Sequence, residues 1–359
     1  MSVKMIDLRS DTATKPTKEM YNAMVSAELG DDMLSEDPTV NKLEAMVIEM
    51  CGKEAAVFAC SGTQSNQLAI HAHCQPGDEL LLNATGHISL YEGGAPAVLS
   101  GVTCRTIDAP DGMLDVESLQ DEVHANNQHQ SPTRLLCLEN TTNVGGGKSY
   151  ELEQVDHLCD WAHENGLLVH MDGARLFNAI VSKGYSPKQL LKNVDSVSIC
   201  FSKGLGCPMG SILVGSREMV TRARRARKIF GGALRQAGVI AATAIYALEN
   251  HIERLAEDHQ HAKQFAEEIS TLDGIKIDPT TIETNIVFFH LDSQRGTAAQ
   301  FLKKLQSKGV GIGAMGKQKL RACTHLDISQ KDIQQAVQAM KEVLATDLNR
   351  VAASESESY

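Results

Sequence analysis

Three short stretches of the sequence carry groups that could act on one ligand. Lys203 follows the apolar run Ser196–Phe201, and Asp172 ends the apolar run that begins at Leu167. Ser61-Gly62-Thr63 follows a third apolar run and opens a helical pattern. Backbone N–H groups at the start of a helix bind phosphate, and open parallel sheets bind ligands at the carboxyl ends of their strands. We therefore expect an amine, a carboxylate and a phosphate site at one edge of a sheet.

This combination suits pyridoxal phosphate. The cofactor needs an amine for a Schiff base, a carboxylate that keeps its pyridine nitrogen protonated, and donors for its phosphate. Lys203, Asp172 and Ser61-Gly62-Thr63 offer these groups in turn. Each has a simpler explanation by itself, because a lysine at a strand end is usually solvated and a serine before a helix usually only caps it. Their arrival at one sheet edge favours the cofactor.

Six motifs carry a resemblance to a known family. In chain order they are Ile6-Asp-Leu-Arg-Ser-Asp-Thr12, Gly30-Asp-Asp32, Glu36-Asp-Pro-Thr39, Asp172-Gly-Ala-Arg175, Ser202-Lys-Gly-Leu205 and Arg235-Gln-Ala-Gly238. They resemble the low-specificity L-threonine aldolases, and the likeness runs from about Met5 to near Leu348. The resemblance implies the aspartate-aminotransferase fold (fold type I) and a homotetramer, a dimer of dimers with active sites built between paired subunits.

The resemblance also assigns the cofactor-binding residues. Lys203 is similar to the Schiff-base lysine, Asp172 to the partner of the pyridine nitrogen, and Ser61, Gly62 and Thr63 to the phosphate site. His87 resembles the histidine that stacks on the cofactor ring, although a lone histidine could equally be a loop-end residue. Arg235 is similar to the arginine that reaches the phosphate from the neighbouring subunit.

A second set of residues resembles the substrate pocket of the family. Ser10, Arg175 and Arg321 resemble the groups that hold the substrate carboxylate, a role for which paired guanidinium donors are well shaped. A surface ion pair is the simpler explanation for each arginine. Tyr91 and His129 match further pocket positions.

The implied reaction is retro-aldol cleavage of L-threonine, L-allo-threonine and related 3-hydroxy amino acids into glycine and an aldehyde. The base that takes the hydroxyl proton stays open among His87 itself, His87 acting through water, and His87 together with His129. A β-elimination on the same scaffold is the nearest alternative. An NAD-dependent oxidoreductase is disfavoured by the lack of an early glycine fingerprint, and a non-catalytic binding protein by the intact Lys203 and Asp172.

Two positions depart from the family pattern. Leu34 stands where relatives commonly have tyrosine, in the stretch Gly30-Asp-Asp-Met-Leu-Ser-Glu-Asp-Pro38. Thr142 stands where a histidine is usual, in Glu139-Asn-Thr-Thr-Asn143. Compared with the family pattern, these positions lack a hydroxyl and a titratable ring. We expect the two differences to affect which substrate is bound and not which cofactor is bound.

The arrangement of apolar runs predicts an α/β fold with two domains. Residues 1–250 are expected to form the large cofactor-binding domain, residues 251–350 a smaller α+β domain, and residues 351–359 a disordered tail. Helices are expected at Asp115–Ala125 and Leu152–Asn165. Short buried strands of a mostly parallel sheet are expected at Ala55–Cys60, Glu79–Asn83, Val102–Asp108, Arg134–Glu139, Leu167–Asp172, Ser196–Phe201 and Ser211–Val214.

Charge, cysteine content and the lengths of apolar runs argue against some classes of protein. The net charge of −11 argues against nucleic-acid binding, and the basic run Arg222–Lys228 spreads around a helix instead of forming a stripe. The nine cysteines are an odd number without a Cys-x-x-Cys pair, which is typical of a reduced cytoplasmic protein. No uncharged apolar run reaches 18 residues, so we expect no membrane insertion.

Two other motifs are weak. Gly311–Gly316 matches the dinucleotide pattern G-x-G-x-x-G, but it follows a helix and precedes a strand. His71, His73 and Cys74 look like metal ligands, yet residues two apart on a helix point to nearly opposite sides. We expect neither NAD nor a metal at these positions.

Overall fold

The computed structural model describes residues 5–125 and 127–346, which fall into two compact units. The larger unit is Lys15–Glu253, and the smaller unit combines the described parts of Met1–Thr14 and Arg254–Tyr359. The expected boundary near residue 250 therefore lies close to the observed one. The expected tail 351–359 lies outside the described residues.

The N-terminal segment belongs to the smaller unit, which corrects its expected place in the large domain. Strand β1 (Ile6–Asp7) pairs in parallel with β11 (Val310–Gly311). Leu8 is fully buried in the hydrophobic core of the smaller unit. Pairing across some 300 residues of sequence cannot be seen in local periodicity, so position along the chain was a poor guide here.

A seven-stranded sheet organises the larger unit, in the order β2-β8-β7-β6-β5-β3-β4. Strand β8 runs antiparallel to both neighbours, and the other pairs are parallel. The mostly parallel α/β sheet is thereby confirmed, and each expected strand agrees with the observed one to within one residue at either end. The strands are β2 (Ala55–Ala59), β3 (Glu79–Asn83), β4 (Thr103–Ile107), β5 (Thr133–Glu139), β6 (Leu168–Gly173), β7 (Ser196–Cys200) and β8 (Ser211–Gly215).

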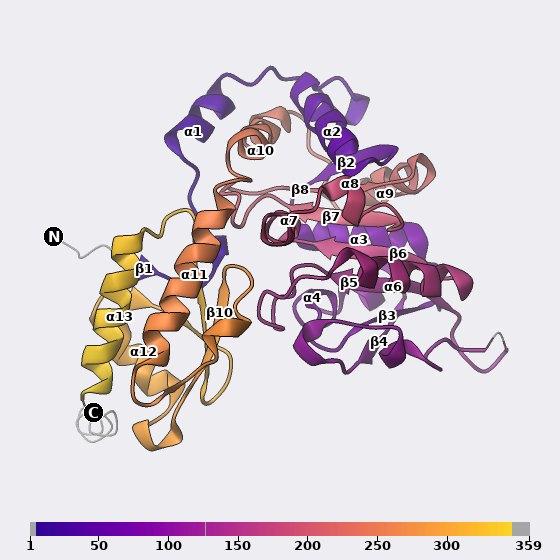
Figure 1. Cartoon of the computed structure of the whole chain (residues 1–359). Helices are drawn as coiled ribbons and strands as arrows, with labels where there is room; N and C mark the ends of the chain where they lie inside the picture. The colour runs from indigo at the N-terminus through magenta and orange to yellow at the C-terminus, as the bar shows by residue number, and fades with distance from the viewer. Residues whose placement is uncertain (1–4, 126, 347–359) are drawn as a thin grey trace, which may run out of the picture. The chain divides into compact units, whose positions relative to one another are not determined.

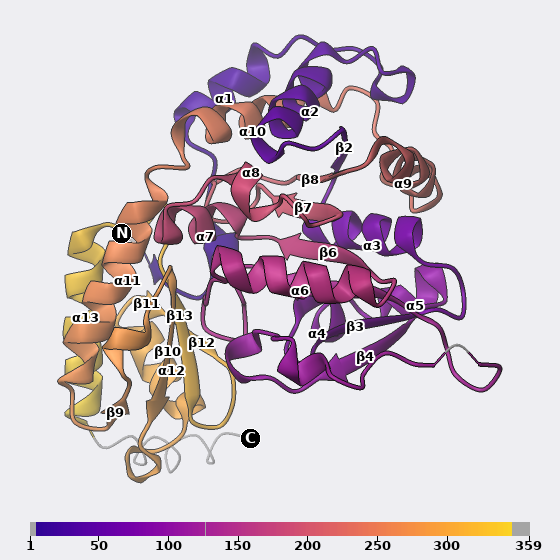
Figure 2. The same cartoon turned by 45° about the vertical axis from the view of Figure 1, so that its right-hand side comes forward.

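Helices cover both faces of this sheet, as Figures 1 and 2 show. Helix α3 packs against α9 and against β7 and β8, while α6 packs on β6 from the other side. Both faces of the central strands are therefore buried, which explains their nearly continuous apolar sequences. The helices of this unit are α1 (Lys18–Val25), α2 (Pro38–Cys51), α3 (Gly62–His73), α4 (His87–Leu90), α5 (Ala95–Ser100), α6 (Leu152–Glu164), α7 (Leu176–Lys183), α8 (Pro187–Leu190), α9 (Arg217–Ile229) and α10 (Gly238–Asn250).

The helix expected at Asp115–Ala125 is wrong. Only Glu117–Leu119 forms a short 3₁₀ turn there. Asp115 and Ser118 hydrogen-bond to each other's backbone N–H groups, which gives the chain a local alternative to a helix. Asp121 then takes a positive φ of 64°. The expected helix at Leu152–Asn165 is confirmed as α6.

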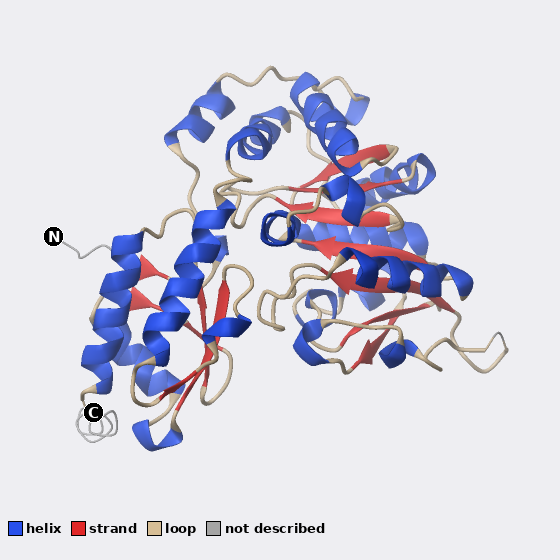
Figure 3. Ribbon diagram, in the orientation of Figure 1, coloured by secondary structure: helices blue, strands red, loops and turns tan. Residues whose placement is uncertain are grey.

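The smaller unit contains a four-stranded sheet in the order β12-β13-β10-β9, flanked by long helices (Figure 3). Its core is formed by apolar side chains of the sheet and of all three helices. Gly311–Gly316 lies in the strand region and opens no helix, so it cannot offer a helix N-terminus to a dinucleotide. The remaining elements are β9 (Ile275–Lys276), β10 (Ile286–Leu291), β12 (Gly313–Ala314), β13 (Lys319–Cys323), α11 (Leu255–Ser270), α12 (Ala298–Ser307) and α13 (Gln330–Leu344). Among the described residues, every helix is too short or too polar to cross a lipid bilayer.

A buried ion pair ties α9 to the segment that precedes α2. Arg227 Nη2 lies 2.8 Å from Asp32 Oδ2, and both side chains are almost fully buried. Arg227 Nη1 also donates to the carbonyl of Phe58 on β2. Removing one partner of such a pair leaves the other charge buried and uncompensated.

We therefore expect Arg227→Met to lower the free energy of unfolding by about 3–5 kcal/mol. Arg222→Met is the matched control on the same helix, because Arg222 pairs with Glu218 on the exposed surface. Its effect should stay below about 1 kcal/mol. Urea titration followed by circular dichroism measures both values. Equal effects of the two substitutions would contradict the assigned role of the buried pair.

Candidate active site

The site lies where β5, β6 and β7 end, within the larger unit. Asp172 is next to last in β6, and Glu139 ends β5 beside it in register. Lys203 follows β7 by three residues, and α3 begins just after β2. The expected meeting of an amine, a carboxylate and a helix start at one sheet edge thus has a structural basis.

Asp172 is a buried carboxylate with two neutral donors. Its side chain is 3% exposed; Oδ1 accepts from the Ala174 N–H at 3.0 Å and Oδ2 from Asn66 Nδ2 at 2.8 Å. The described part of the chain gives it no ion pair with a basic side chain. A buried charge is costly. The His87 ring lies near Asp172, but its hydrogen bond goes to Glu92. The protonated pyridine nitrogen of pyridoxal phosphate would place a positive charge directly against Asp172, so this donor set fits the cofactor.

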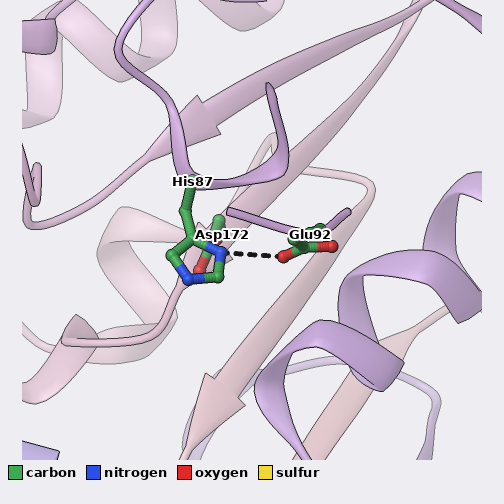
Figure 4. Close-up of side chains that lie close together, drawn as sticks. All are labelled: His87, Glu92 and Asp172. Atoms are coloured by element: carbon green, nitrogen blue, oxygen red, sulfur yellow. Dashed lines mark hydrogen bonds and ion pairs between the residues drawn. The ribbon is translucent and has the colours of Figure 1, made fainter. Parts of the chain in front are cut away.

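His87 begins α4 and points toward two carboxylates (Figure 4). Its Nδ1 lies 2.9 Å from Glu92 Oε1, and one potential ligand atom from each of His87, Glu92 and Asp172 lies within 4.8 Å of the others. Burial lowers the pKa of His87, but the hydrogen bond from its ring to Glu92 and the charge of Asp172 outweigh burial, and the pKa is raised. The two carboxylates therefore stabilise the imidazolium form relative to the neutral ring.

Glu92 and Asn66 are site residues that sequence reasoning missed. The Glu92 side chain is inaccessible to solvent, and it accepts from Asn66 Nδ2 at 2.8 Å and from Gln67 Nε2 at 2.6 Å. A signal was present in the sequence: α3 carries four successive polar residues from Gln64 to Gln67, three of them buried, although it packs on the sheet. Polar residues on the covered face of a helix indicate partners inside the protein.

Glu139 fastens two loops to the end of β5. Its Oε2 accepts from the His87 backbone N–H at 2.6 Å, and its Oε1 accepts from the Asn143 N–H. Burial and the charge of Asp172 raise its pKa, whereas the two backbone donors oppose that rise. Thr142 lies in the second loop, fully buried, and its hydroxyl accepts from the Lys148 N–H at 3.1 Å.

The start of α3 offers donors beside the end of β7. Ser61 caps the helix, since its hydroxyl accepts from the Gln64 N–H at 3.1 Å, and Gly62 and Thr63 form the first turn. A side chain at Gly62 would come within 3.6 Å of Cys200 Sγ, the last residue of β7. The phosphate donors thus lie close to the strand that leads to Lys203.

Hydrogen bonds to backbone carbonyls fix the loop that carries Lys203. His251 Nδ1 lies 2.8 Å from the Leu205 carbonyl, and the Gly206 N–H donates to the Lys203 carbonyl. The charge of Lys203 lowers the pKa of His87, which places the two side chains within electrostatic range. Tyr91 also adjoins His87, with ring centroids 5.6 Å apart.

His129 is not brought to the site. It is exposed and lies four residues before Thr133, where β5 begins, whereas Glu139 at the other end of that strand belongs to the site. A strand of this length spans about 20 Å. Within one chain His129 therefore lies away from this sheet edge, because it adjoins the other end of β5.

The arginines and Ser10 lie in different settings. Arg175 is buried at the start of α7, three residues after Asp172. Arg235 is largely exposed and its Nη1 lies 2.8 Å from Asp31 Oδ2. In the smaller unit, Arg321 Nη2 donates to the Arg9 carbonyl, directly before Ser10, at 3.1 Å. The structure thus brings Arg321 and Ser10 into one neighbourhood.

Leu34 ends the 3₁₀ turn Asp32–Leu34 and is 65% exposed in the single chain. Its N–H donates to the carbonyl of Asp31, the residue that pairs with Arg235. The departure at position 34 therefore lies beside the arginine that the sequence assigns to the phosphate, on the surface of the larger unit.

The chain is similar to known proteins over almost its whole length. The beta-eliminating lyase family model matches residues 7–292. A low-specificity L-threonine aldolase of Escherichia coli K12 is 40% identical over 342 residues, covering 95% of this chain and 100% of that protein. Low-specificity L-threonine aldolase 1 of Arabidopsis thaliana is 37% identical, covering 96% and 98%.

Solved structures share the fold at lower identity. A threonine aldolase of Leishmania major superposes with a TM-score of 0.81 at 20% identity, covering 94% of this chain and 99% of that one. A serine palmitoyltransferase of Sphingomonas wittichii gives 0.74 at 17% identity, covering 94% and 87%. The fold-type-I architecture is thereby confirmed. Together with the sequence relatives, these matches show that the chain belongs to the beta-eliminating lyase family, among the low-specificity L-threonine aldolases.

Proposed function

We propose that the protein cleaves L-threonine, L-allo-threonine and related 3-hydroxy amino acids into glycine and an aldehyde, with pyridoxal phosphate as cofactor. The observation that carries the proposal is Asp172, a buried carboxylate at a sheet edge whose described partners are neutral donors. The identity to L-threonine aldolases over almost the whole chain supports the same activity.

Different residues of the site bind different groups of the cofactor. Lys203 attaches it, Asp172 keeps a proton on its pyridine nitrogen, and the start of α3 at Ser61, Gly62 and Thr63 binds its phosphate. His87 would stack on its ring. When bound, pyridoxal phosphate withdraws electrons from the bond that breaks at the substrate α-carbon.

The substrate carboxylate is assigned to Arg175, Arg321 and Ser10. Guanidinium groups bind carboxylates with two parallel hydrogen bonds, which fixes an orientation as well as a position. Orientation selects the reaction, because the bond that breaks must stand perpendicular to the cofactor ring. The neighbouring positions of Arg321 and Ser10 support this assignment.

His87 is the group assigned to the hydroxyl proton of the substrate. Glu92 occupies its Nδ1, so Nε2 is the ring atom left to receive a proton, directly or through one water. Because Glu92 stabilises the imidazolium, the neutral ring becomes a stronger base. Pairing with His129 would need that residue from a neighbouring subunit, because within one chain it lies before β5.

The proposal includes the assembly and the location of the protein. We expect a cytoplasmic homotetramer, in which Arg235 reaches the cofactor phosphate of a neighbouring subunit. All nine cysteines are free thiols, and most are buried, as is typical of cytoplasmic proteins. Light scattering after size-exclusion chromatography measures the assembly.

The activity is tested by incubating the purified protein and pyridoxal phosphate with L-threonine. Glycine and acetaldehyde should appear in equal amounts. Release of ammonia without glycine would instead identify a β-elimination.

Lys203→Ala should yield a folded protein that cannot attach the cofactor covalently, since the attaching amine is gone. Desalting should then remove all visible cofactor absorbance, and threonine cleavage should be lost. Lys183→Ala is the control, because Lys183 is a partly buried lysine that pairs with Glu151. Retention of covalent cofactor by the Lys203 variant would contradict the assignment.

Glu92→Gln should lower the pKa of His87, because the favourable carboxylate is lost while burial still opposes the charged ring. A raised folded-state pKa stabilises the protein below the pKa of the unfolded chain, and this stabilisation is lost as pH rises through the folded value. In the variant that contribution should disappear.

Proton NMR titration of the His87 ring in the cofactor-free protein measures the change. Glu79→Gln serves as the control, since Glu79 pairs with the different histidine His124. An unchanged His87 titration in Glu92→Gln would show that Glu92 does not set its charge.

Arg321→Leu should raise the KM for L-threonine by about tenfold or more, because a charge-assisted hydrogen bond to the substrate is lost. The affinity for pyridoxal phosphate should stay the same. Arg295→Leu, at an exposed pair with Asp273 in the same unit, is the control. A normal KM in the Arg321 variant would place the carboxylate elsewhere.

A further inference from the structure

A row of buried polar residues lies behind Asp172, on the face of the sheet that α3 covers. His170 pairs in register with Ser196, and Asp172 with Ser198, across strands β6 and β7. Residues two apart on a strand share a face, so all four side chains point the same way. Each is at most 3% exposed. Buried polar groups at this density must satisfy one another.

Hydrogen bonds join this row into one chain that ends on Asn66 of α3. His73 Nε2 lies 2.8 Å from Ser196 Oγ, and His170 Nδ1 lies 2.9 Å from the same oxygen. On its other side His170 Nε2 lies 3.2 Å from Asn66 Oδ1. The Ser198 hydroxyl donates to that Asn66 oxygen as well.

The positions of the ring protons decide which atom donates and which accepts in each of these hydrogen bonds. Burial lowers the pKa of His73 to about 4 and that of His170 to about 3, so both rings are neutral near pH 7 and carry one proton each. His73 Nδ1 is buried and has no hydrogen-bond partner among the described residues. An orphaned buried N–H is rarer than an under-satisfied acceptor, so the His73 proton belongs on Nε2.

The remaining assignments follow in order. His73 donates to Ser196 Oγ, and the Ser196 proton then goes to His170 Nδ1. His170 must carry its own proton on Nε2, where it donates to Asn66 Oδ1. The oxygen of Asn66 thus receives two donors, and its amide nitrogen faces the opposite direction.

The amide nitrogen of Asn66 meets both carboxylates of the site. Nδ2 lies 2.8 Å from Asp172 Oδ2 and 2.8 Å from Glu92 Oε1, one N–H for each. The reverse orientation would set the amide oxygen against two carboxylates and leave His170 and Ser198 facing donors. Both ends of the side chain therefore select the same orientation.

We propose that Asn66 is a positioning residue that orients the carboxylates of Asp172 and Glu92 together. Asn66 thereby couples the partner of the pyridine nitrogen to the partner of His87, and the neutral His170 holds Asn66 in the orientation that makes this possible. The inference rests on the proposed role of Asp172 in binding the cofactor.

A double-mutant cycle on cofactor affinity tests the coupling. Asn66→Leu should raise the dissociation constant for pyridoxal phosphate about tenfold, since a hydrogen bond to a charged group is lost. The same change in an Asp172→Asn background should alter it by less than about threefold, because the carboxylate that Asn66 orients is absent. Absorbance titration of the cofactor-free protein gives the constants, and circular dichroism checks folding.

Failure of this proposal is separable from failure of the proposed function. If Asp172→Asn alone leaves cofactor affinity and turnover unchanged, the assignment of Asp172 itself is wrong. If Asp172→Asn is defective and the effects of the two substitutions simply add, Asn66 does not act through Asp172 and only the positioning role is overturned.

Two His170 variants test the orientation without altering Asn66. His170→Gln places an amide N–H near the former Nε2 and should keep cofactor affinity within about threefold of wild type, whereas His170→Leu has no donor and should weaken it about tenfold. Melting temperatures show whether each variant is folded. Wild-type affinity in folded His170→Leu, or equal weakening in both variants, would overturn the proposal.

Discussion

The candidate active site depends on one constraint: Asp172 is a carboxylate withdrawn from water at the end of a central strand. Its two oxygens receive neutral donors, the Ala174 N–H and the Asn66 amide, and these offset only part of the cost of burying a charge. A cationic ring nitrogen would offset the rest. The proposed cofactor would thus bind at a carboxylate whose position is set by the architecture of the sheet.

Three carboxylates meet at this edge, and each is compensated by a different means. Asp172 accepts from the Ala174 N–H and the Asn66 amide, Glu92 pairs with the imidazole of His87, and Glu139 accepts from two backbone N–H groups. These differences separate their roles, because a carboxylate engaged by backbone holds loops in place whereas one engaged by an imidazole sets a proton affinity. The side chain of Asn66 lies between two of the three, where a single amide can satisfy both.

The fold itself does not select the reaction. A threonine aldolase and a serine palmitoyltransferase share it with this chain at 20% and 17% identity, so different chemistries use the same sheet. The selection lies in side chains around the edge. Thr142, in place of the usual histidine, is turned into its own loop by a hydrogen bond from Lys148 N–H, so this departure from the family pattern serves local structure.

By itself the sequence determined the strands of the larger unit and the central residues of the site. Buried strands are continuous apolar runs, and Asp172 and Lys203 follow such runs directly, so local pattern was enough to place them at a sheet edge. The local pattern gave a wrong prediction at Asp115–Ala125. There the side chains of Asp115 and Ser118 hydrogen-bond to backbone N–H groups and so replace the hydrogen bonds of a helix.

Tertiary structure alone decided which distant residues complete the site. Asn66 meets Asp172 across 106 residues of sequence and Glu92 across 26, and Ile6 pairs with Val310 in the smaller unit. The hydrophobic periodicity of the sequence indicates that a side chain is buried. It does not indicate which residue that side chain contacts, because the contact depends on strand register and on the packing of a helix over the sheet. The same reason explains His129, whose distance from the site became visible only when β5 had a direction.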